Sequence, residues 1–285
     1  MHYFIRVSVS IMVILFSFCL CSGDEIMVWE LPAGTKLADI SGKSAWIKSD
    51  ALQKKPNGLA IENDLLVVCA KLGEMGLVLH GKCTDVSTEA SVEICFLDAN
   101  GQAVAIKTIN LVESKDGVQL DIGLTDGGSS QALLARDASS LKVTSISKVT
   151  SFCVRALMAV IFRPDFFDTA MIYHTSLPIF SQGWANVPVE NYLFGLLNEN
   201  AVAACAWNSK KVQVKLNVLS GEKEKSFGSL QLLIDQTDPA VLIGVIKSSQ
   251  AFVSCNFQKV VAGNLFVSDR RARGNAVWRK TQFFT

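Results

Sequence analysis

One stretch of the chain, residues 192–220, constrains the fold more than any other. It ends in an alternation of apolar and polar residues, in which the apolar positions are Val212, Val214, Leu216 and Val218. Successive side chains of a β-strand point to opposite faces, so this pattern predicts a strand with one dry face and one wet face. The preceding run at 201–207 is apolar throughout, which is typical of a strand covered on both faces. The stretch therefore predicts β-sheet architecture, and it contains no motif that assigns an activity.

The rest of the chain repeats this pattern at short, even intervals. Runs of strand length recur between clusters of Gly, Asn and Asp, and no long amphipathic helix stands out. Two such runs, 91–98 and 103–109, adjoin the turn sequence at 98–101 and predict a hairpin. Residues 131–136 predict one or two turns of helix. We expect an all-β fold, an antiparallel β-sandwich, with two sandwiches in tandem.

A weak internal repeat suggests where the two sandwiches divide. In each half a Glu-Asn pair precedes an apolar run with a cysteine, Cys69 in the first half and Cys205 in the second. Chance is the alternative explanation, because buried strands draw on few residue types. The expected organisation is a signal peptide over 1–23, a first β-sandwich domain over 24–155 and a second over 156–285.

The first 23 residues have the features of a secretory signal peptide. Arg6 is the only Lys or Arg before residue 24, an apolar run follows over 7–20, and small residues close it at 21–23. A membrane anchor is the alternative, but the run is shorter than the ~20 apolar residues that a spanning helix needs. We expect the mature chain to be secreted, extracellular or periplasmic, and to have no transmembrane segment.

The charge balance argues against nucleic acid as a partner. The sequence holds 27 Lys and Arg against 26 Asp and Glu, and Arg6 leaves with the signal peptide, so the mature chain is close to neutral. Proteins that bind nucleic acid present a strong basic field. The one local basic cluster, at 270–280, is explained at least as well by a solvated terminal segment. With 49% apolar residues the chain can bury a large core.

The cysteines favour buried thiols over a disulfide framework. Six remain after removal of the signal peptide, namely Cys69, Cys83, Cys95, Cys153, Cys205 and Cys255. Four of them lie inside apolar, strand-like runs, where a free cysteine acts as a small buried hydrophobe. A single bridged pair stays open as an alternative. No two of the six have the two-to-four-residue spacing of a structural zinc site, so we expect no metal site and no cofactor.

The segment 163–190 interrupts the strand rhythm with three prolines and several aromatic residues. An irregular stretch of this length inside a compact domain is usually functional or disordered, and its aromatic residues argue against disorder. If the protein binds a ligand, we expect the site here and in the adjoining residues. The candidate ligand-binding residues are Arg163, Asp168, Tyr173, His174, Trp184, Glu190 and Tyr192.

Each candidate residue type suits a sugar ligand. Trp184 and Tyr173 would offer flat stacking faces with a polar tip. The charged and imidazole side chains would supply hydrogen-bond donors and acceptors that fix orientation. In the alternative interpretation, the aromatic residues of this segment, Phe180 and Trp184 among them, plug the end of the core or the join between the domains.

Catalytic motifs are absent from the sequence. It contains no glycine-rich phosphate loop, no G-x-S-x-G, no H-E-x-x-H and no EF-type calcium loop. The carboxylates Asp165, Asp168 and Glu190 flank the aromatic segment, and sugar hydrolysis uses a pair of carboxyl groups. We name no catalytic residue and keep a glycan-active enzyme as an alternative.

Residues 183–207 carry a family resemblance. They include Gly183-Trp184, then Asn191-Tyr192, then Cys205-Ala206-Trp207, and the stretch resembles β-sandwich portions of large secreted bacterial proteins linked to polysaccharide breakdown. The resemblance includes no catalytic motif, so no functional residue is carried over. It implies a bacterial, exported, glycan-related role.

The expected function is that of a secreted, non-catalytic glycan-binding or accessory β-sandwich protein. Its expected partner is a polysaccharide or a cell-surface glycan. Two alternatives stay open. One is a glycan-active enzyme, such as a glycoside hydrolase or its N-terminal portion, and the other is a structural cell-surface or adhesion module.

Overall fold

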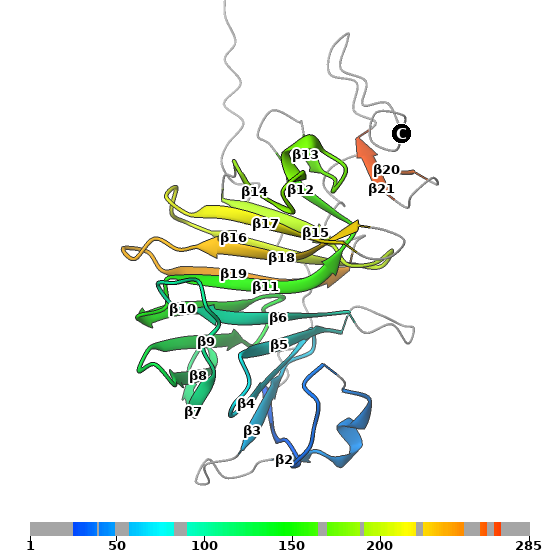
Figure 1. The fold of residues 1–285 in the computed structure, drawn as a ribbon. Helices are drawn as coiled ribbons and strands as arrows, with labels where there is room; N and C mark the ends of the chain where they lie inside the picture. Colours follow the sequence, from blue (N-terminus) through cyan, green and yellow to red (C-terminus); the bar gives the residue numbers. More distant parts are fainter. Residues whose placement is uncertain are drawn as a thin grey trace, which may run out of the picture.

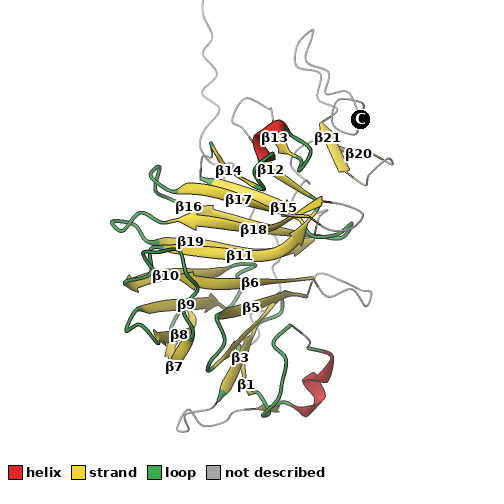
Figure 2. Cartoon of the chain, in the orientation of Figure 1, coloured by secondary structure: helices red, strands yellow, loops and turns green. Residues whose placement is uncertain are grey.

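In the computed structural model the chain forms a sandwich of two antiparallel β-sheets (Figure 1 and Figure 2). The structure describes residues 25–38, 40–48, 57–82, 90–164, 170–188, 191–220, 225–247, 257–260 and 265–268. The elements in these ranges are strands, apart from two short 3-10 helices, η1 (Ser41–Ala45) and η2 (Pro178–Phe180). The prediction of an all-β antiparallel sandwich is therefore confirmed. The predicted signal peptide at 1–23 lies outside the described residues.

The first sheet, sheet A, has the strand order β14-β17-β18-β11-β6-β5-β4-β3-β1-β2. Its strands are β1 (Met27–Glu30), β2 (Ile47–Lys48), β3 (Gly58–Glu62), β4 (Leu66–Lys71), β5 (Gly76–Gly81), β6 (Ala90–Leu97), β11 (Ser151–Met158), β14 (Trp184–Val187), β17 (Gln213–Ser220) and β18 (Lys225–Leu233).

The second sheet, sheet B, has the strand order β13-β12-β15-β16-β19-β10-β9-β8-β7. Its strands are β7 (Ile106–Ser114), β8 (Gly117–Leu124), β9 (Ser129–Ala135), β10 (Leu141–Ser147), β12 (Val160–Pro164), β13 (Ala170–Tyr173), β15 (Tyr192–Leu196), β16 (Ala201–Trp207) and β19 (Ala240–Lys247). A separate two-stranded sheet pairs β20 (Phe257–Val260) with β21 (Leu265–Ser268).

The main core lies between sheets A and B, where alternate residues of most strands are buried. In β17 the alternation predicted from the sequence is confirmed, because Val214 and Leu216 are buried while Lys215 between them is partly exposed. The rings of Phe96 and Phe152, on neighbouring strands of sheet A, meet edge-to-face with their centroids 6.2 Å apart. Such pairs add to the stability that burial of the rings already provides.

Strand β16 is covered on both faces, as its apolar composition predicts. Ala203 and Cys205 belong to the main core, whereas Val202 on the opposite face packs in a separate small cluster with Phe162 and Leu196. Cys69, Cys95 and Cys153 are also buried, and all four of these described cysteines are free thiols. The prediction of buried thiols is confirmed for these four, and Cys83 and Cys255 lie outside the described residues.

The predicted hairpin at 91–109 is only half correct. The turn forms, because Asp98 Oδ1 accepts hydrogen bonds from the backbone N–H groups of Asn100 and Gln102, each at 2.8 Å. Ala103 forms an isolated antiparallel bridge with Leu97, but the strand that follows, β7, pairs with β8 in sheet B. The reason is that, beyond this bridge, β5 and β11 occupy the two edges of β6.

The predicted helical turns at 131–136 are wrong, since these residues belong mainly to β9. Ala132 and Leu134 are buried while Gln131 and Leu133 are partly exposed, which is the two-residue period of a strand. Pairing with β8 on one side and β10 on the other fixes the extended conformation.

The two predicted halves, 24–155 and 156–285, share both sheets. Strand β18 pairs with β11 in sheet A, and β19 pairs with β10 in sheet B. In Figure 1 the strands run in series from β1–β4 at one end of the sandwich to β12–β14 at the other. The predicted boundary falls inside β11, and the repeat-related strands β4 and β16 lie in different sheets. The division into two domains stays a prediction.

The segment between β1 and β2 covers part of the outer face of sheet A. Leu31, Leu37 and Trp46 from this segment form a second apolar cluster with sheet residues that include Val67 and Cys69. The carbonyl oxygen of Leu37 lies 2.7 Å from Nε2 of the buried His80 on β5. This segment and the sheet residues beneath it are called the covered face below.

A buried carboxylate sits beside this cluster. Glu62 is 1% exposed, accepts a 2.7 Å hydrogen bond from Trp29 Nε1 and forms ion pairs with Lys43 and Lys82. Burial acts to raise the pKa of Glu62, but the hydrogen bonds and charges of the two lysines outweigh it and hold that pKa below its ordinary value. Because Lys43 lies in η1, this carboxylate fastens the covering segment to the sheet.

Candidate functional site

Five of the seven residues predicted to bind a ligand are described by the structure, and two of them meet. Arg163 Nη1 donates a 3.0 Å hydrogen bond to the carbonyl oxygen of Pro188, and the hydroxyl of Tyr173 donates to the same oxygen at 3.1 Å. The Tyr173 side chain is buried, and burial raises its pKa while the charge of Arg163 opposes that rise. This pair therefore anchors the chain at Pro188 to strands β12 and β13.

The other three described candidates lie apart from this pair. Trp184 is 41% exposed on β14, at the edge of sheet A, with Lys215 Nζ 4.2 Å from its ring centroid. His174 is exposed, and its Nδ1 lies 2.7 Å from Ser176 Oγ. Tyr192 lies on β15 in sheet B, where its ring meets that of Phe194 at 6.1 Å. The described candidates thus do not converge on one cavity.

Asp168 and Glu190 lie outside the described residues, as does Asp165. The interpretation of the aromatic residues as a plug holds for one of them, because Phe180 is buried and its ring meets Phe227 edge-to-face at 5.1 Å. Trp184, in contrast, remains open to solvent over part of its surface. Ligand binding by the segment 163–192 stays a prediction.

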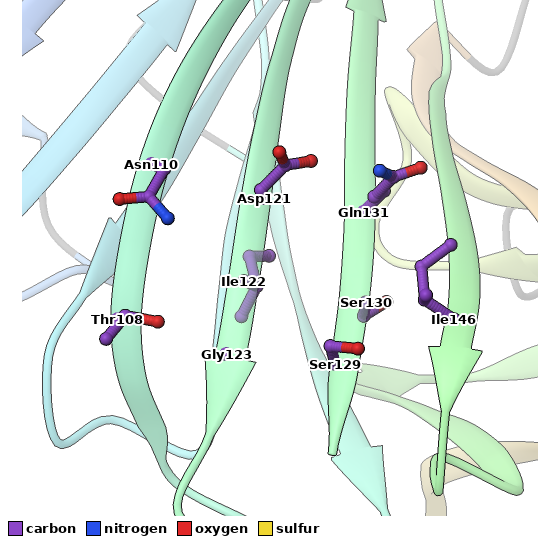
Figure 3. A pocket seen from close by; sticks show the side chains of 9 residues that line it. All are labelled: Thr108, Asn110, Asp121, Ile122, Gly123, Ser129, Ser130, Gln131 and Ile146. Atoms are coloured by element: carbon purple, nitrogen blue, oxygen red, sulfur yellow. The ribbon is translucent and has the colours of Figure 1, made fainter. Parts of the chain in front are cut away.

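A hollow of about 270 Å³ lies elsewhere, on the outer face of sheet B (Figure 3). We call it the sheet B hollow, and its lining residues are Thr108, Asn110, Asp121, Ile122, Gly123, Ser129, Ser130, Gln131 and Ile146. Its volume is just below the ~300 Å³ at which the range for small-molecule sites begins.

Strand register places the polar side chains of the hollow in a row. Asn110 on β7 is the register partner of Asp121 on β8, and Asp121 is in turn the partner of Gln131 on β9. Figure 3 shows these three side chains abreast on neighbouring strands. Adjacent strands are about 4.8 Å apart, so the row presents an amide, a carboxylate and a second amide across about 10 Å.

The neighbouring row of residues, Thr108, Gly123 and Ser129, forms the bottom of the hollow. Gly123 is the register partner of both Thr108 and Ser129, so the middle of this row has no side chain. A Cβ atom at Gly123 would lie 2.4 Å from Thr108 Oγ1, closer than the contact distance of any real side chain. A side chain at Gly123 would therefore require Thr108 Oγ1 to move, and the hydroxyls of Thr108 and Ser129 flank the gap.

One apolar and one charged group complete the hollow. Ile146 on β10 is 54% exposed although it is a large aliphatic residue, and it lines one side. Asp121 is the only ionisable side chain among the lining residues. Gln119 Nε2 donates a 2.7 Å hydrogen bond to Asp121 Oδ1, which orients the carboxylate and leaves Oδ2 able to accept a hydrogen bond from a ligand.

Sequence reasoning missed the sheet B hollow. The signal was present as an alternation in 117–124, where the outward residues Gln119, Asp121 and Gly123 alternate with the buried Leu120 and Ile122. That pattern predicts a strand with a polar outer face, but such a face is ordinary. The hollow requires the registers of β7, β8 and β9 together, and these come from tertiary structure.

Compared with known proteins, the chain matches no family model and no curated protein sequence. Within the described ranges, no helix combines the length and the apolar character required to cross a membrane. The functional assignment therefore depends on the chemistry of the surfaces described above.

Proposed function

We propose that the protein is a secreted, non-catalytic glycan-binding β-sandwich protein and that the sheet B hollow is its binding site. The observation that carries the proposal is the row Asn110, Asp121 and Gln131 beside the gap at Gly123. Secretion follows from the expected signal peptide, and the binding surface lies on a strand scaffold.

The chemistry of the row suits the hydroxyl groups of a sugar. A hydroxyl both donates and accepts, and the row offers a carboxylate that accepts and two amides that each donate and accept. Hydrogen bonds to a charged acceptor such as Asp121 are the stronger kind. The exposed side chain of Ile146 supplies an apolar surface for the C–H groups of a sugar ring.

The lining residues favour binding over hydrolysis. Glycoside hydrolysis generally uses two carboxyl groups on either side of the scissile bond. The hollow provides one, that of Asp121, and the amides of Asn110 and Gln131 cannot act as general acids. A glycan bound here is held by polar contacts, and the lining residues that the structure describes include no second acid to protonate a leaving group.

The test is retention on a panel of immobilised polysaccharides, with assay of new reducing ends in the same samples. The wild type is expected to be retained by at least one polysaccharide without product formation. Asp121→Ala is expected to lose retention, whereas the control Glu113→Gln, an exposed acid on β7 outside the lining residues, is expected to keep it.

Three results would contradict the proposal. Equal retention of Asp121→Ala and wild type would place binding elsewhere on the molecule. Release of reducing ends would indicate the glycan-active enzyme instead. Retention on no polysaccharide would leave the structural or adhesion module as the better description.

A further inference from the structure

Two thiols face each other across neighbouring strands of sheet A. Cys95 on β6 is the direct register partner of Cys153 on β11, and Phe96 pairs with Phe152 next to them. In an antiparallel pair, directly opposed residues have Cα atoms about 4.5–5.5 Å apart and side chains on the same face. A disulfide needs Cα atoms about 4.4–6.8 Å apart, so the backbone already has the spacing that a bridge requires.

The surroundings hold the two side chains against each other. Cys95 and Cys153 form a small buried cluster with Leu97, and Ala103 packs against it. On the same face, two residues along each strand, Glu93 and Arg155 are also register partners, and their charged groups approach to 3.6 Å. Side chains on this face therefore do meet across β6 and β11.

The other two described cysteines lack such a partner. Cys69 on β4 is opposed by Ala60 and Val78, and Cys205 on β16 is opposed by Leu193 and Ile243. All four are buried free thiols in the structure. Among the described cysteines, direct opposition is thus confined to Cys95 and Cys153.

We propose that Cys95 and Cys153 are a disulfide site, closed by exchange with a small-molecule or protein disulfide while the chain folds. One cysteine loses its proton and attacks a sulfur of the donor disulfide, which releases one donor thiolate and leaves a mixed disulfide. The second cysteine loses its proton and attacks the protein sulfur of that mixed disulfide, which releases the other donor thiolate. Two electrons and two protons pass to the donor, which becomes two thiols.

Both thiols are buried in the folded chain. Burial raises the pKa of both thiols, but at Cys153 hydrogen bonds with Ser229 and Arg155 oppose this effect. In the folded chain this burial keeps both sulfurs from further exchange. The completed bridge joins the two ends of the segment that holds β7 to β10, which are the strands around the sheet B hollow.

The experiment refolds the full chain with oxidised glutathione, blocks remaining thiols with iodoacetamide under denaturing conditions, and maps the peptides without reduction. We expect one linked peptide that contains Cys95 and Cys153, with Cys69 and Cys205 alkylated. Reduction should lower the melting temperature by about 5–10 °C. Cys69→Ala and Cys205→Ala should keep the linked peptide and this shift, and Cys95→Ala and Cys153→Ala should lose both.

Full alkylation of Cys95 and Cys153 in the refolded wild type would overturn the proposal, and so would linkage of either one to another cysteine. The peptide map of the wild type decides this even where a cysteine variant fails to fold. Because the readout is a covalent link, it is independent of any glycan-binding result.

Discussion

The outer faces of the two sheets each carry a carboxylate, but only one of these is enclosed. Glu62 beside the covered face of sheet A is 1% exposed, and Trp29, Lys43 and Lys82 surround it. Asp121 in the sheet B hollow is partly exposed, and its partner is the neutral side chain of Gln119. A carboxylate therefore takes part in structural contacts on sheet A, whereas on sheet B a carboxylate lies at an open surface.

The comparison of Glu62 with Asp121 shows that burial by a covering segment decides whether a carboxylate on an outer face is structural or available to a ligand. The segment between β1 and β2 seals part of sheet A with Leu37 and Trp46, so Glu62 can be kept only with cationic partners. The part of sheet B that holds Asp121 has no comparable covering segment among the described residues. A carboxylate that keeps free hydrogen-bonding capacity at such a surface is available to a ligand.

The largest loss of stability is expected from a substitution in the core between the two sheets. Leu216 on β17 is fully buried between the sheets, whereas the adjacent Lys215 points outward. Leu216→Ala should destabilise the protein by about 2–5 kcal/mol. Lys215→Ala should change stability by no more than about 0.5 kcal/mol. Urea unfolding measures both, and equal losses would mean that the assignment of faces in β17 is wrong.

Removal of the enclosed carboxylate should come next in size. Glu62→Gln leaves Lys43 and Lys82 without their anionic partner and should cost about 3 kcal/mol, near the lower end for a broken buried pair because both lysines are about one-third exposed. Urea unfolding of this variant beside Asp121→Asn compares the same chemical change on the two faces. Equal stability of the two variants would remove the distinction between the faces.

Lowering the pH should reduce the contribution of Glu62 to the free energy of unfolding. Its pKa is held below the ordinary value of 4.5 in the folded protein, so its contribution is complete above that value and is lost as the pH falls through the folded pKa. The stability difference between wild type and Glu62→Gln should therefore be widest at neutral pH and should narrow below about pH 4.5. Unfolding curves across this range test the sign, and a gap that widens in acid would contradict it.

Trp184 tests whether the segment 163–192 or the sheet B hollow binds the ligand. Its ring is 41% exposed, so Trp184→Ala should cost about 1 kcal/mol, well below the ~3–5 kcal/mol of a core tryptophan. The variant should keep retention on glycan if the hollow is the site. Loss of retention with unchanged melting temperature would move the site to this segment, and a large loss of stability would mark Trp184 as a core residue.

Only a small effect on stability is expected at Asp121. Asp121→Asn should change the free energy of unfolding by about 0.5 kcal/mol or less, because the side chain is partly exposed and its partner Gln119 can still donate a hydrogen bond to the amide oxygen. Glycan retention should nevertheless fall, since the charged acceptor is gone. A loss of stability as large as that of Glu62→Gln would show that Asp121 is structural.

Local sequence determined the strands and their faces. In β17 the alternation of Val214, Lys215 and Leu216 predicts which face of the strand packs on the core. In β16 the continuous apolar residues predict burial of both faces. These properties follow from the two-residue period of a strand, which needs no knowledge of its neighbours. The turn at Asp98 was also predictable, because the hydrogen bonds of its carboxylate go to Asn100 and Gln102, within four residues along the chain.

Tertiary structure alone decided which strands became neighbours and therefore which side chains met. β7 does not continue the predicted hairpin, because β5 and β11 pair along most of the two edges of β6. Residues 131–136 form mainly strand because β8 and β10 pair with them on either side. The row of Asn110, Asp121 and Gln131 and the opposed thiols of Cys95 and Cys153 both depend on register between strands far apart in sequence. Register is set by the packing of whole sheets, so no single stretch of the chain contains it.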